Sequence, residues 1–547
     1  MPTGWNAERI YIMKQTTPFA LRMLLCLLVG MFLFSSCKQN PSTQNNPSNN
    51  PDGNDQQEEE IVTDPDEKLP YELPAQEDLS LDGEPYLYRA YVRSNYDSKN
   101  TMEDGNPAFY CEDFWVGVAT GASDALEYAV YARNSQIEST YNVQIRQVPQ
   151  NGNMVGELLS FYQNGDQFDL TIILAKSAAQ AATQNLLRDI NSMQYVDLTH
   201  EAFDQNSIRE LSMGGKLYYL SGDMNISTMD CASSTMVNLS LYEDLTETIV
   251  EAFGNDTAWE DIYNIVKAKK WTMDNMLKIA ELATIDADST DGALGNSSED
   301  RIGYCQYATS TLNYFYGAGG RVTDMTDEGY PQFVIQESQN QDVFDYLYKH
   351  FNKYQTNLNI PYGWSGVVNG NFIEKGNTLF AEMGFWSTRK YLYMQDTFPY
   401  GFLPNPLYQE GDEYHSLVFF YNTVHLWAVP TLVNDDYRSQ MMLQILAAYS
   451  NVNKPGSTMD AYYMRTLYFV ISGPSAGSRE VMSLIKDSMV YDIAILYDWG
   501  GWVTALQTLG EKTFNEHASL VSQLQTTAIP AMEETIEAFK NPSGLPK

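Results

Sequence analysis

A continuous apolar run at 168–175 limits the folds open to this chain more than any other segment. The run shows no alternation of apolar and polar residues, as expected of a strand that is buried on both faces of a parallel sheet. Strand and helix patterns alternate around it, which predicts an α/β fold. The expected strands lie near 86–92, 114–118 and 143–148, and the expected helices at 123–141, with Ser123 as N-cap, and 154–162.

The rest of the chain continues the α/β pattern and then becomes mainly helical. A second α/β-like stretch begins after 217–220, and Thr272 is expected to cap a helix with one apolar stripe. The globular part is much longer than one typical domain, so two lobes are expected. Beyond Pro430, periodic segments indicate helices at 436–450, 478–490 and 515–540.

The N-terminus has the order of features found in a secretory signal peptide. Lys14 and Arg22 flank the start of an apolar run at 23–34, which is shorter than the roughly 20 apolar residues of a membrane span. Two serines and Cys37 follow this run. That order resembles the lipobox of bacterial lipoproteins, although Phe34 stands at the third position before the Cys, where Leu is usual. The resemblance implies that Cys37 is lipidated and becomes the first residue of the mature protein.

The segment from Lys38 to about Pro85 is expected to be a disordered tether. Asn, Gln, Ser, Pro, Asp and Glu dominate it, so it cannot bury enough apolar surface to offset its ordering entropy. A flexible chain of this length has an end-to-end reach of roughly 40 Å. We therefore predict a signal peptide at 1–36, starting at Met1 or Met13, and a lipidated tether at 37–85. The protein would be held at the cell surface, on the outer face of the cytoplasmic membrane.

Charge and cysteine content limit the partners that the protein can bind and the metal or disulfide sites that it can form. The chain has 33 Lys and Arg against 70 Asp and Glu, a formal net charge of −37, which argues against nucleic acid and anionic membrane surfaces as partners. Its 38 tyrosines outnumber its 23 phenylalanines, and tyrosine is suited to partly solvated clefts as well as to cores. Outside the predicted signal peptide and lipid site, only Cys111, Cys231 and Cys305 remain. Their spacing matches no metal-binding pattern and no disulfide framework. A single disulfide between two of them remains an alternative.

Several short segments together resemble a known family. They include Lys270-Trp271-Thr272, and further pieces at 129–143, 197–219, 316–320, 376–380 and 398–406. Taken in their order along the chain, they are similar to family 1 extracellular solute-binding proteins, the maltose-binding-protein-like components of ABC importers. The resemblance covers roughly 110–500.

This resemblance implies a two-lobed, periplasmic-binding-protein-like α/β fold. Its lobes are joined by hinge strands, and ligand is held in the cleft between them. Lobe one would take 86–228 with 420–460, and lobe two would take 229–419 with 461–547. The implied protein is a monomer without cofactor or catalytic activity, which closes around a sugar or oligosaccharide and delivers it to ABC permease subunits.

Candidate ligand residues follow from what a sugar site needs, namely planar aromatic rings and polar side chains at the rim. Trp386 stands where maltose-binding-like relatives carry a stacking tryptophan, and Trp499 and Trp502 fall where such relatives place another. The alternative is that each indole belongs to the core. Polar candidates follow expected strands or lie near the first crossover, and each could instead be a solvated loop residue. These are Thr120, Ser123, Lys176, Ser177, Asp223 and Asp230.

An alternative function is that of an α/β-hydrolase-like esterase. Gly473-Pro474-Ser475-Ala476-Gly477 matches the nucleophile elbow of α/β-hydrolases, and His517 follows in the required chain order, after an acidic residue that could be Asp487, Asp492 or Asp498. Against an esterase of this kind, the pattern is short, and Gly, Pro and Ser also make an ordinary loop before a helix.

Two further alternatives concern metal and polymer binding. The acidic turn from Asp286 to Asp300 hints at calcium, but an EF-hand register would put Asp291 where Gly is required. The five histidines show no zinc-binding spacing, so no metal is expected. A surface lipoprotein that binds extended glycan without an importer is the remaining alternative function.

Overall fold

The computed structural model describes most of the globular part of the chain. The described residues are 73, 78–93, 114, 125–150, 153–287, 299–307, 311–353, 357–360, 373–385, 397–418, 424–468, 476–503 and 522–541. They lie in one compact unit that extends from 68 to 547. The predicted signal peptide, Cys37 and most of the predicted tether are outside the described residues.

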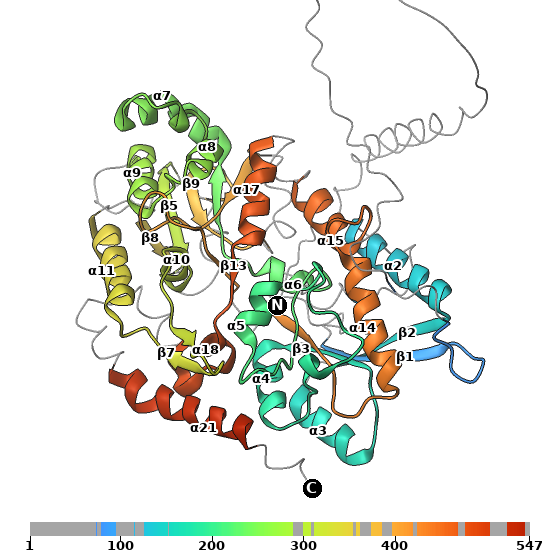
Figure 1. Ribbon diagram of the computed structural model, residues 1–547. Helices are drawn as coiled ribbons and strands as arrows, with labels where there is room; N and C mark the ends of the chain where they lie inside the picture. The colour runs from blue at the N-terminus through green and yellow to red at the C-terminus, as the bar shows by residue number, and fades with distance from the viewer. Residues whose placement is uncertain are drawn as a thin grey trace, which may run out of the picture. The chain divides into compact units, whose positions relative to one another are not determined.

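A four-stranded sheet with the order β12-β3-β1-β2 forms the centre of what we call the first lobe (Figure 1). β1 (Tyr86–Arg93) pairs in parallel with β2 (Val143–Gln150) and with β3 (Leu170–Leu174). β12 (His425–Ala428) returns from much later in the chain and pairs antiparallel with β3, so the sheet is mixed. β3 is the apolar run predicted from the sequence, and four of its five residues are buried.

Helices cover this sheet, and three of them match predicted helices, namely α2 (Ala125–Tyr141), α3 (Met154–Asn164) and α14 (Asp436–Ser450). The fourth, α4 (Ala175–Thr183), was not predicted and begins directly where β3 ends. The core between sheet and helices contains a buried carboxylate, Asp169, which accepts hydrogen bonds from Ser439 Oγ at 2.6 Å and Arg89 N at 2.8 Å. Burial raises the pKa of Asp169. These bonds satisfy the carboxylate and fix α14, which follows β12, to the strands near the start of the lobe.

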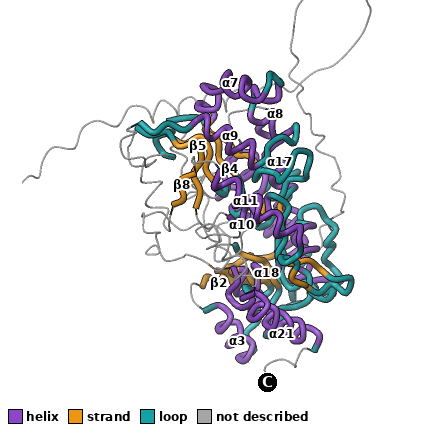
Figure 2. The backbone as a smooth tube through the Cα atoms, turned by 90° about the vertical axis from the view of Figure 1, so that its left-hand side faces the viewer, coloured by secondary structure: helices purple, strands orange, loops and turns teal. Residues whose placement is uncertain are grey.

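A five-stranded sheet with the order β10-β4-β9-β5-β8 forms the centre of the second lobe. β4 (Thr235–Asn238) is antiparallel to β9 (Thr378–Glu382) and to β10 (Tyr400–Leu403). β5 (Ile302–Tyr307) is parallel to β9 and to β8 (Asn357–Ile360). Figure 2 shows the strands in two groups, with β4, β5 and β8 apart from β2.

The helices of the second lobe include the one that Thr272 was predicted to cap. Thr272 Oγ1 accepts a hydrogen bond from Asn275 N at 3.2 Å and begins α9, which confirms the prediction. The adjacent Trp271 is buried and donates to the Pro404 carbonyl at 2.9 Å. The helices here are α7 (Leu239–Phe253), α8 (Ile262–Lys267), α9 (Met273–Ala283), α10 (Thr311–Gly317), α11 (Ser338–Lys353) and α17 (Ala476–Asp487).

Shorter elements and the C-terminal helices complete the unit. The short elements before α14 are η2 (Ile190–Ser192), α5 (Gln205–Leu211), α6 (Ile226–Asp230), η3 (Thr257–Glu260), β6 (Thr323–Met325), β7 (Pro331–Phe333) and β11 (Ser416–Leu417). Those after it are α15 (Thr458–Asp460), η6 (Ala461–Tyr468), β13 (Met489–Val490), α18 (Ile493–Tyr497), η7 (Trp499–Gly501), η9 (Leu524–Ala528) and α21 (Ile529–Lys540). The predicted mainly helical C-terminal part is thus confirmed for the described residues, and none of their helices is long and apolar enough to span a membrane.

The C-terminal segment touches both lobes. α18 and α21 contact α4 of the first lobe. The same segment also contacts the second lobe. Asp492, at the start of α18, accepts hydrogen bonds from Tyr316 Oη at 2.6 Å and Thr323 N at 3.0 Å, both of the second lobe. The two-lobed α/β class is confirmed, while the predicted assignment of 461–547 to lobe two stays a prediction.

Candidate functional site

Within the described residues, three segments that run between the two lobes lie side by side. The first crossing, 231–234, leads from α6 to β4, and the second contains β11 on the way from β10 to β12. The third contains β13, which pairs in parallel with β11. Ser233 N donates to the Leu417 carbonyl at 2.9 Å, and Val418 N donates to the Val490 carbonyl at 2.9 Å. Three adjacent backbone segments can bend together, so this small sheet is suited to act as a hinge.

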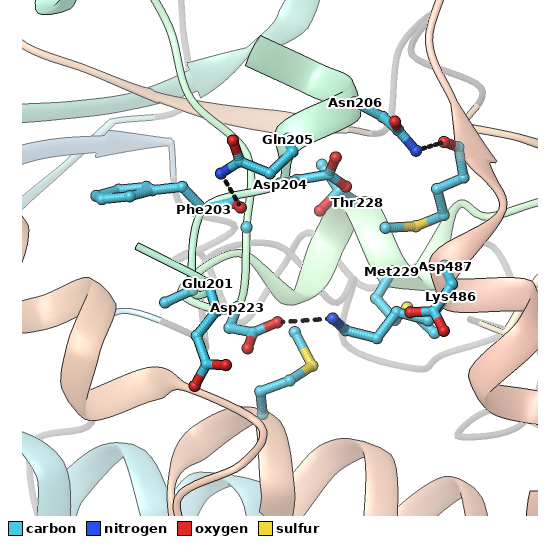
Figure 3. Close-up of a pocket in the computed structure, with 14 residues that line it drawn as sticks. Glu201, Phe203, Asp204, Gln205, Asn206, Asp223, Thr228, Met229, Lys486 and Asp487 are labelled. Atoms are coloured by element: carbon cyan, nitrogen blue, oxygen red, sulfur yellow. Dashed lines mark hydrogen bonds and ion pairs between the residues drawn. The ribbon is translucent and has the colours of Figure 1, made fainter. Parts of the chain in front are cut away.

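A pocket of about 280 Å³ lies beside these crossings (Figure 3). Its wall is acidic and contains a single lysine and three methionine side chains. The charged residues are Glu201, Asp204, Asp223, Lys486 and Asp487, and the methionines are Met229, Met459 and Met489. Phe203 is the one aromatic residue in this wall, which offers little surface for stacking a sugar ring.

A buried ion pair between Asp223 and Lys486 crosses the pocket (Figure 3). Lys486 Nζ lies 3.2 Å from Asp223 Oδ1, and the Asp223 side chain is only 4% exposed. Val452 N also donates to Asp223 Oδ2 at 2.8 Å. Burial raises the pKa of Asp223, and Lys486 opposes that rise. For Lys486, burial lowers the pKa, but the attraction of Asp223 and Asp204 outweighs it and the pKa is raised.

This ion pair joins elements that pack on different lobes. Asp223 N donates to the Ala202 carbonyl at 2.8 Å, and the neighbouring Leu220 pairs with Trp427 of β12, so this loop belongs to the first lobe. Lys486 stands in the last turn of α17, which packs against α8 and β10 of the second lobe. The pair therefore contributes to how the lobes are held beside the hinge.

The third crossing is also fixed to the first lobe. Tyr491 Oη donates to Asp204 Oδ2 at 2.8 Å, and Tyr491 N donates to Glu210 Oε2 at 2.7 Å. Asn206 Nδ2 donates to the Met489 carbonyl at 2.8 Å. Asp204 additionally caps α5 through Ser207 N. These bonds hold 489–491 on α5, so bending at this crossing is expected before Met489.

Comparison with solved structures identifies the architecture. The extracellular solute-binding protein from Staphylococcus aureus, solved in complex with maltose, superposes with a TM-score of 0.50 at 10% identity, over 84% of this chain and 100% of that one. The chain has the fold of an extracellular solute-binding protein. The galacto-N-biose-/lacto-N-biose I-binding protein of the ABC transporter from Bifidobacterium longum gives a TM-score of 0.49 at 12% identity, over 83% of this chain and 99% of that one. No family model and no curated protein matches the sequence.

Within this solute-binding-protein fold, two predicted ligand residues lie where β3 ends and α4 begins. Lys176 and Ser177 are half-buried in the first turn of α4. Lys176 Nζ lies 3.8 Å from Asp498 Oδ2, and Asp498 follows α18 directly. The helix after β3 and the C-terminal segment therefore meet at this strand end, which is the kind of position where α/β folds bind ligands.

The other two polar candidates within the described chain are buried close to the hinge. Asp223 holds the ion pair with Lys486, and Asp230 accepts a hydrogen bond from Tyr462 Oη. Asp223 is 3% exposed and Asp230 is 5% exposed, so neither is a solvated loop residue. The structure brings these two aspartates to the first crossing, as the sequence predicted, and their contact with ligand stays a prediction.

The two C-terminal tryptophans are packed inside the protein. The Trp499 ring stacks on Tyr497 with 5.2 Å between ring centroids, and its Nε1 donates to Thr535 Oγ1 at 2.8 Å. Trp502 is 2% exposed and its Nε1 donates to the Ala494 carbonyl at 3.1 Å. Both indole N–H groups already have partners within the protein. The predicted ligand contact of these rings stays a prediction, as does that of Trp386, Thr120 and Ser123, which lie outside the described residues.

The described part of the hydrolase pattern has a structural role. Ser475 and His517 lie outside the described residues. Asp492 is one of the three acidic candidates, and its carboxylate oxygens already accept hydrogen bonds within the protein. Besides its bonds to Tyr316 and Thr323, it caps α18 by accepting from Ala494 N at 2.9 Å. A carboxylate with this many fixed donors orients a helix and is poorly placed to orient a catalytic histidine.

No metal-binding group of three or more His, Cys, Asp or Glu side chains is found among the described residues. At the acidic turn suggested by the sequence, Asp300 is buried and accepts from Ala287 N at 2.9 Å, while 288–298 lie outside the described part. Cys305 is buried, and burial raises the pKa of its thiol to about 12, which suits an inert core residue.

Sequence reasoning missed the residues that organise the hinge. Lys486, Tyr491 and Glu210 carried no motif, because each gains its role only from a partner far along the chain. Lys486 carried no local signal either, since its helix face also contains Arg479 and Ser483.

Proposed function

We propose that this protein is the substrate-binding component of an ABC importer and captures a sugar or oligosaccharide between its two lobes. The observation that carries the proposal is the hinge of three paired crossings between two α/β lobes, in a fold shared with a protein solved in complex with maltose. Lobes joined in this way can close around a small ligand and release it again by bending. Binding, with no chemical step, is what the arrangement supports.

We further propose the ligand residues that the sequence indicated. Trp386 would stack on a sugar face, while Lys176 and Ser177 at the β3 end and Asp223 and Asp230 near the first crossing would lie at the polar rim. The described positions support the polar part, because these four side chains lie at the end of a parallel strand or beside the hinge. Thr120 and Ser123 complete the proposed set from the first lobe.

The anchor is proposed from the lipobox-like sequence. Cys37→Ala should leave the protein unprocessed or release it into the medium, because the lipid-bearing thiol is absent. Lipid labelling and membrane fractionation measure this result. Cys26→Ala is the matched control, since Cys26 lies inside the predicted apolar run and its loss should leave anchoring intact. A lipid-labelled, membrane-bound Cys37→Ala protein would end the lipoprotein proposal.

A thermal-shift screen against a sugar library tests the function. A ligand at 100 times its Kd stabilises the folded state by about 2.7 kcal/mol, so a true ligand should clearly raise the unfolding temperature. The library should contain maltose, malto-oligosaccharides, lacto-N-biose and long glycans. Stabilisation by a mono- to tetrasaccharide supports the importer role. Binding of long polysaccharide alone favours a surface glycan-binding lipoprotein, and no shift with any sugar contradicts carbohydrate capture.

A further inference from the structure

The first lobe carries a tight turn built on two glycines. Met213 and Lys216 pair with each other across Gly214 and Gly215, which both adopt positive φ, 59° and 76°. The turn is fixed to the first lobe, because Asn191 Nδ2 donates to the Gly215 carbonyl at 2.9 Å. Ile190 N donates to the Leu217 carbonyl at 2.7 Å and strengthens the same attachment.

A hairpin from the second lobe lies against this turn. β6 and β7 form the hairpin, and its tip is closed by Thr326 N donating to the Tyr330 carbonyl at 2.8 Å and Gly329 N donating to the Thr326 carbonyl at 2.8 Å. The hairpin stands between α10 and α11 in the chain, and α11 packs against both α10 and α9. It therefore belongs to the second lobe.

The contact between turn and hairpin combines a backbone hydrogen bond with a close ring approach. Gly214 N donates to the Gly329 carbonyl at 2.8 Å. The Tyr330 ring covers Gly214 so closely that a Cβ at this position would lie 2.6 Å from Tyr330 Oη and 2.7 Å from Tyr330 Cζ. Lys540 Nζ, at the end of α21, lies 4.6 Å from the centroid of the same ring. The ring therefore contacts both a glycine of the turn and a lysine of α21.

The neighbouring glycine makes no such contact. A Cβ at Gly215 would meet nothing within 4 Å, although its backbone has the same left-handed conformation. An alanine at either position therefore introduces similar backbone strain. Only the alanine at position 214 would also push against Tyr330. Comparing the Gly214→Ala and Gly215→Ala variants therefore separates the loss of the Tyr330 contact from the backbone strain in the turn.

We propose that the hairpin tip and the Gly214 turn form a clasp that holds the lobes closed over ligand and opens to let it leave. The inference rests on the proposed function, because it assigns a regulatory contact to the same inter-lobe site. Among the described residues, the contact between the turn and the hairpin tip consists of one backbone hydrogen bond and one ring packed on a glycine. A contact of this size can break and re-form without disturbing either core.

Ligand dissociation from the full-length protein tests the clasp, with maltose as probe. Gly214→Ala and Tyr330→Ala should each raise the maltose dissociation rate at least tenfold, with the association rate changed less than twofold. Gly215→Ala should leave both rates within twofold of wild type. Equal dissociation rates for the Gly214→Ala and Gly215→Ala proteins would overturn the clasp.

Amide hydrogen exchange tests the clasp without any sugar. The Gly214 amide reports directly on the hydrogen bond to Gly329, so exchange in the peptide around 211–218 should speed up at least tenfold in Tyr330→Ala and remain unchanged in Gly215→Ala. Unchanged exchange in Tyr330→Ala contradicts the clasp. If maltose does not bind at all, the proposed maltose capture fails while this exchange result still decides the clasp. If the Tyr330→Ala protein loses about 1.4 kcal/mol of unfolding free energy for each tenfold rise in exchange, the faster exchange reflects global destabilisation and the proposal is overturned.

Discussion

Replacing Trp502 with alanine is expected to lower the free energy of unfolding by about 3–5 kcal/mol, the cost of truncating a buried aromatic side chain. The indole is 2% exposed, and its edge meets Phe333 with 6.4 Å between ring centroids. Truncation also removes the hydrogen bond from Nε1, while the Ala494 carbonyl keeps the one from Asp498 N at 2.8 Å. The expected loss therefore comes mainly from the cavity, and urea unfolding measures it.

Affinity distinguishes a core role from a ligand contact. If Trp502 is a core residue, the folded fraction of Trp502→Ala keeps the sugar affinity of wild type. Trp386→Ala is the matched comparison and should show the reverse pattern. Its sugar binding should weaken by about 2–4 kcal/mol, as for a buried aromatic hot spot, with little loss of stability. A Trp502→Ala protein that is stable but has lost affinity would place this ring in the ligand site, as the sequence alone suggested.

Replacing Lys486 with methionine is expected to destabilise the protein by about 3–5 kcal/mol, because Asp223 is left buried without its counter-ion. Asp223 is only 4% exposed, so solvent compensates little for loss of the ammonium group. Methionine is unbranched like lysine, so the substitution removes the charge and keeps most of the side-chain packing. The change in chemical denaturation midpoint gives the magnitude.

The double variant Lys486→Met with Asp223→Asn is the control for this pair. It removes both charges while preserving the shape of Asp223, and should recover most of the stability lost in the single variant. Recovery assigns the loss to the unpaired carboxylate. A double variant as unstable as Lys486→Met would instead assign the loss to packing of the lysine side chain and contradict the ion-pair account.

Local sequence patterns predicted the elements well where a short stretch of chain determines them. The apolar run became β3 because every side chain along it has a partner layer to pack against, and Thr272 caps α9 because its hydroxyl reaches an amide three residues ahead. The order of such elements, together with the family resemblance, was sufficient to predict two α/β lobes.

Long-range pairing could not be predicted in the same way. β12 joins the first sheet from far along the chain and runs antiparallel to β3, and no local pattern states that direction. Asp223 was selected as a loop residue near a crossover, but its burial and its pairing with Lys486 depend on how α17 packs. Trp499 and Trp502 show the same limit, since sequence marks a tryptophan without showing whether it faces a cleft or a core.

Isothermal titration of the full-length protein with the sugar that stabilises it most tests the central claim directly. Capture between two lobes predicts saturable binding of one small sugar per chain. It also predicts that affinity falls when Trp386 is replaced and is retained when Trp502 is replaced. The absence of saturable heat with every mono- to tetrasaccharide tested would contradict carbohydrate capture by this protein.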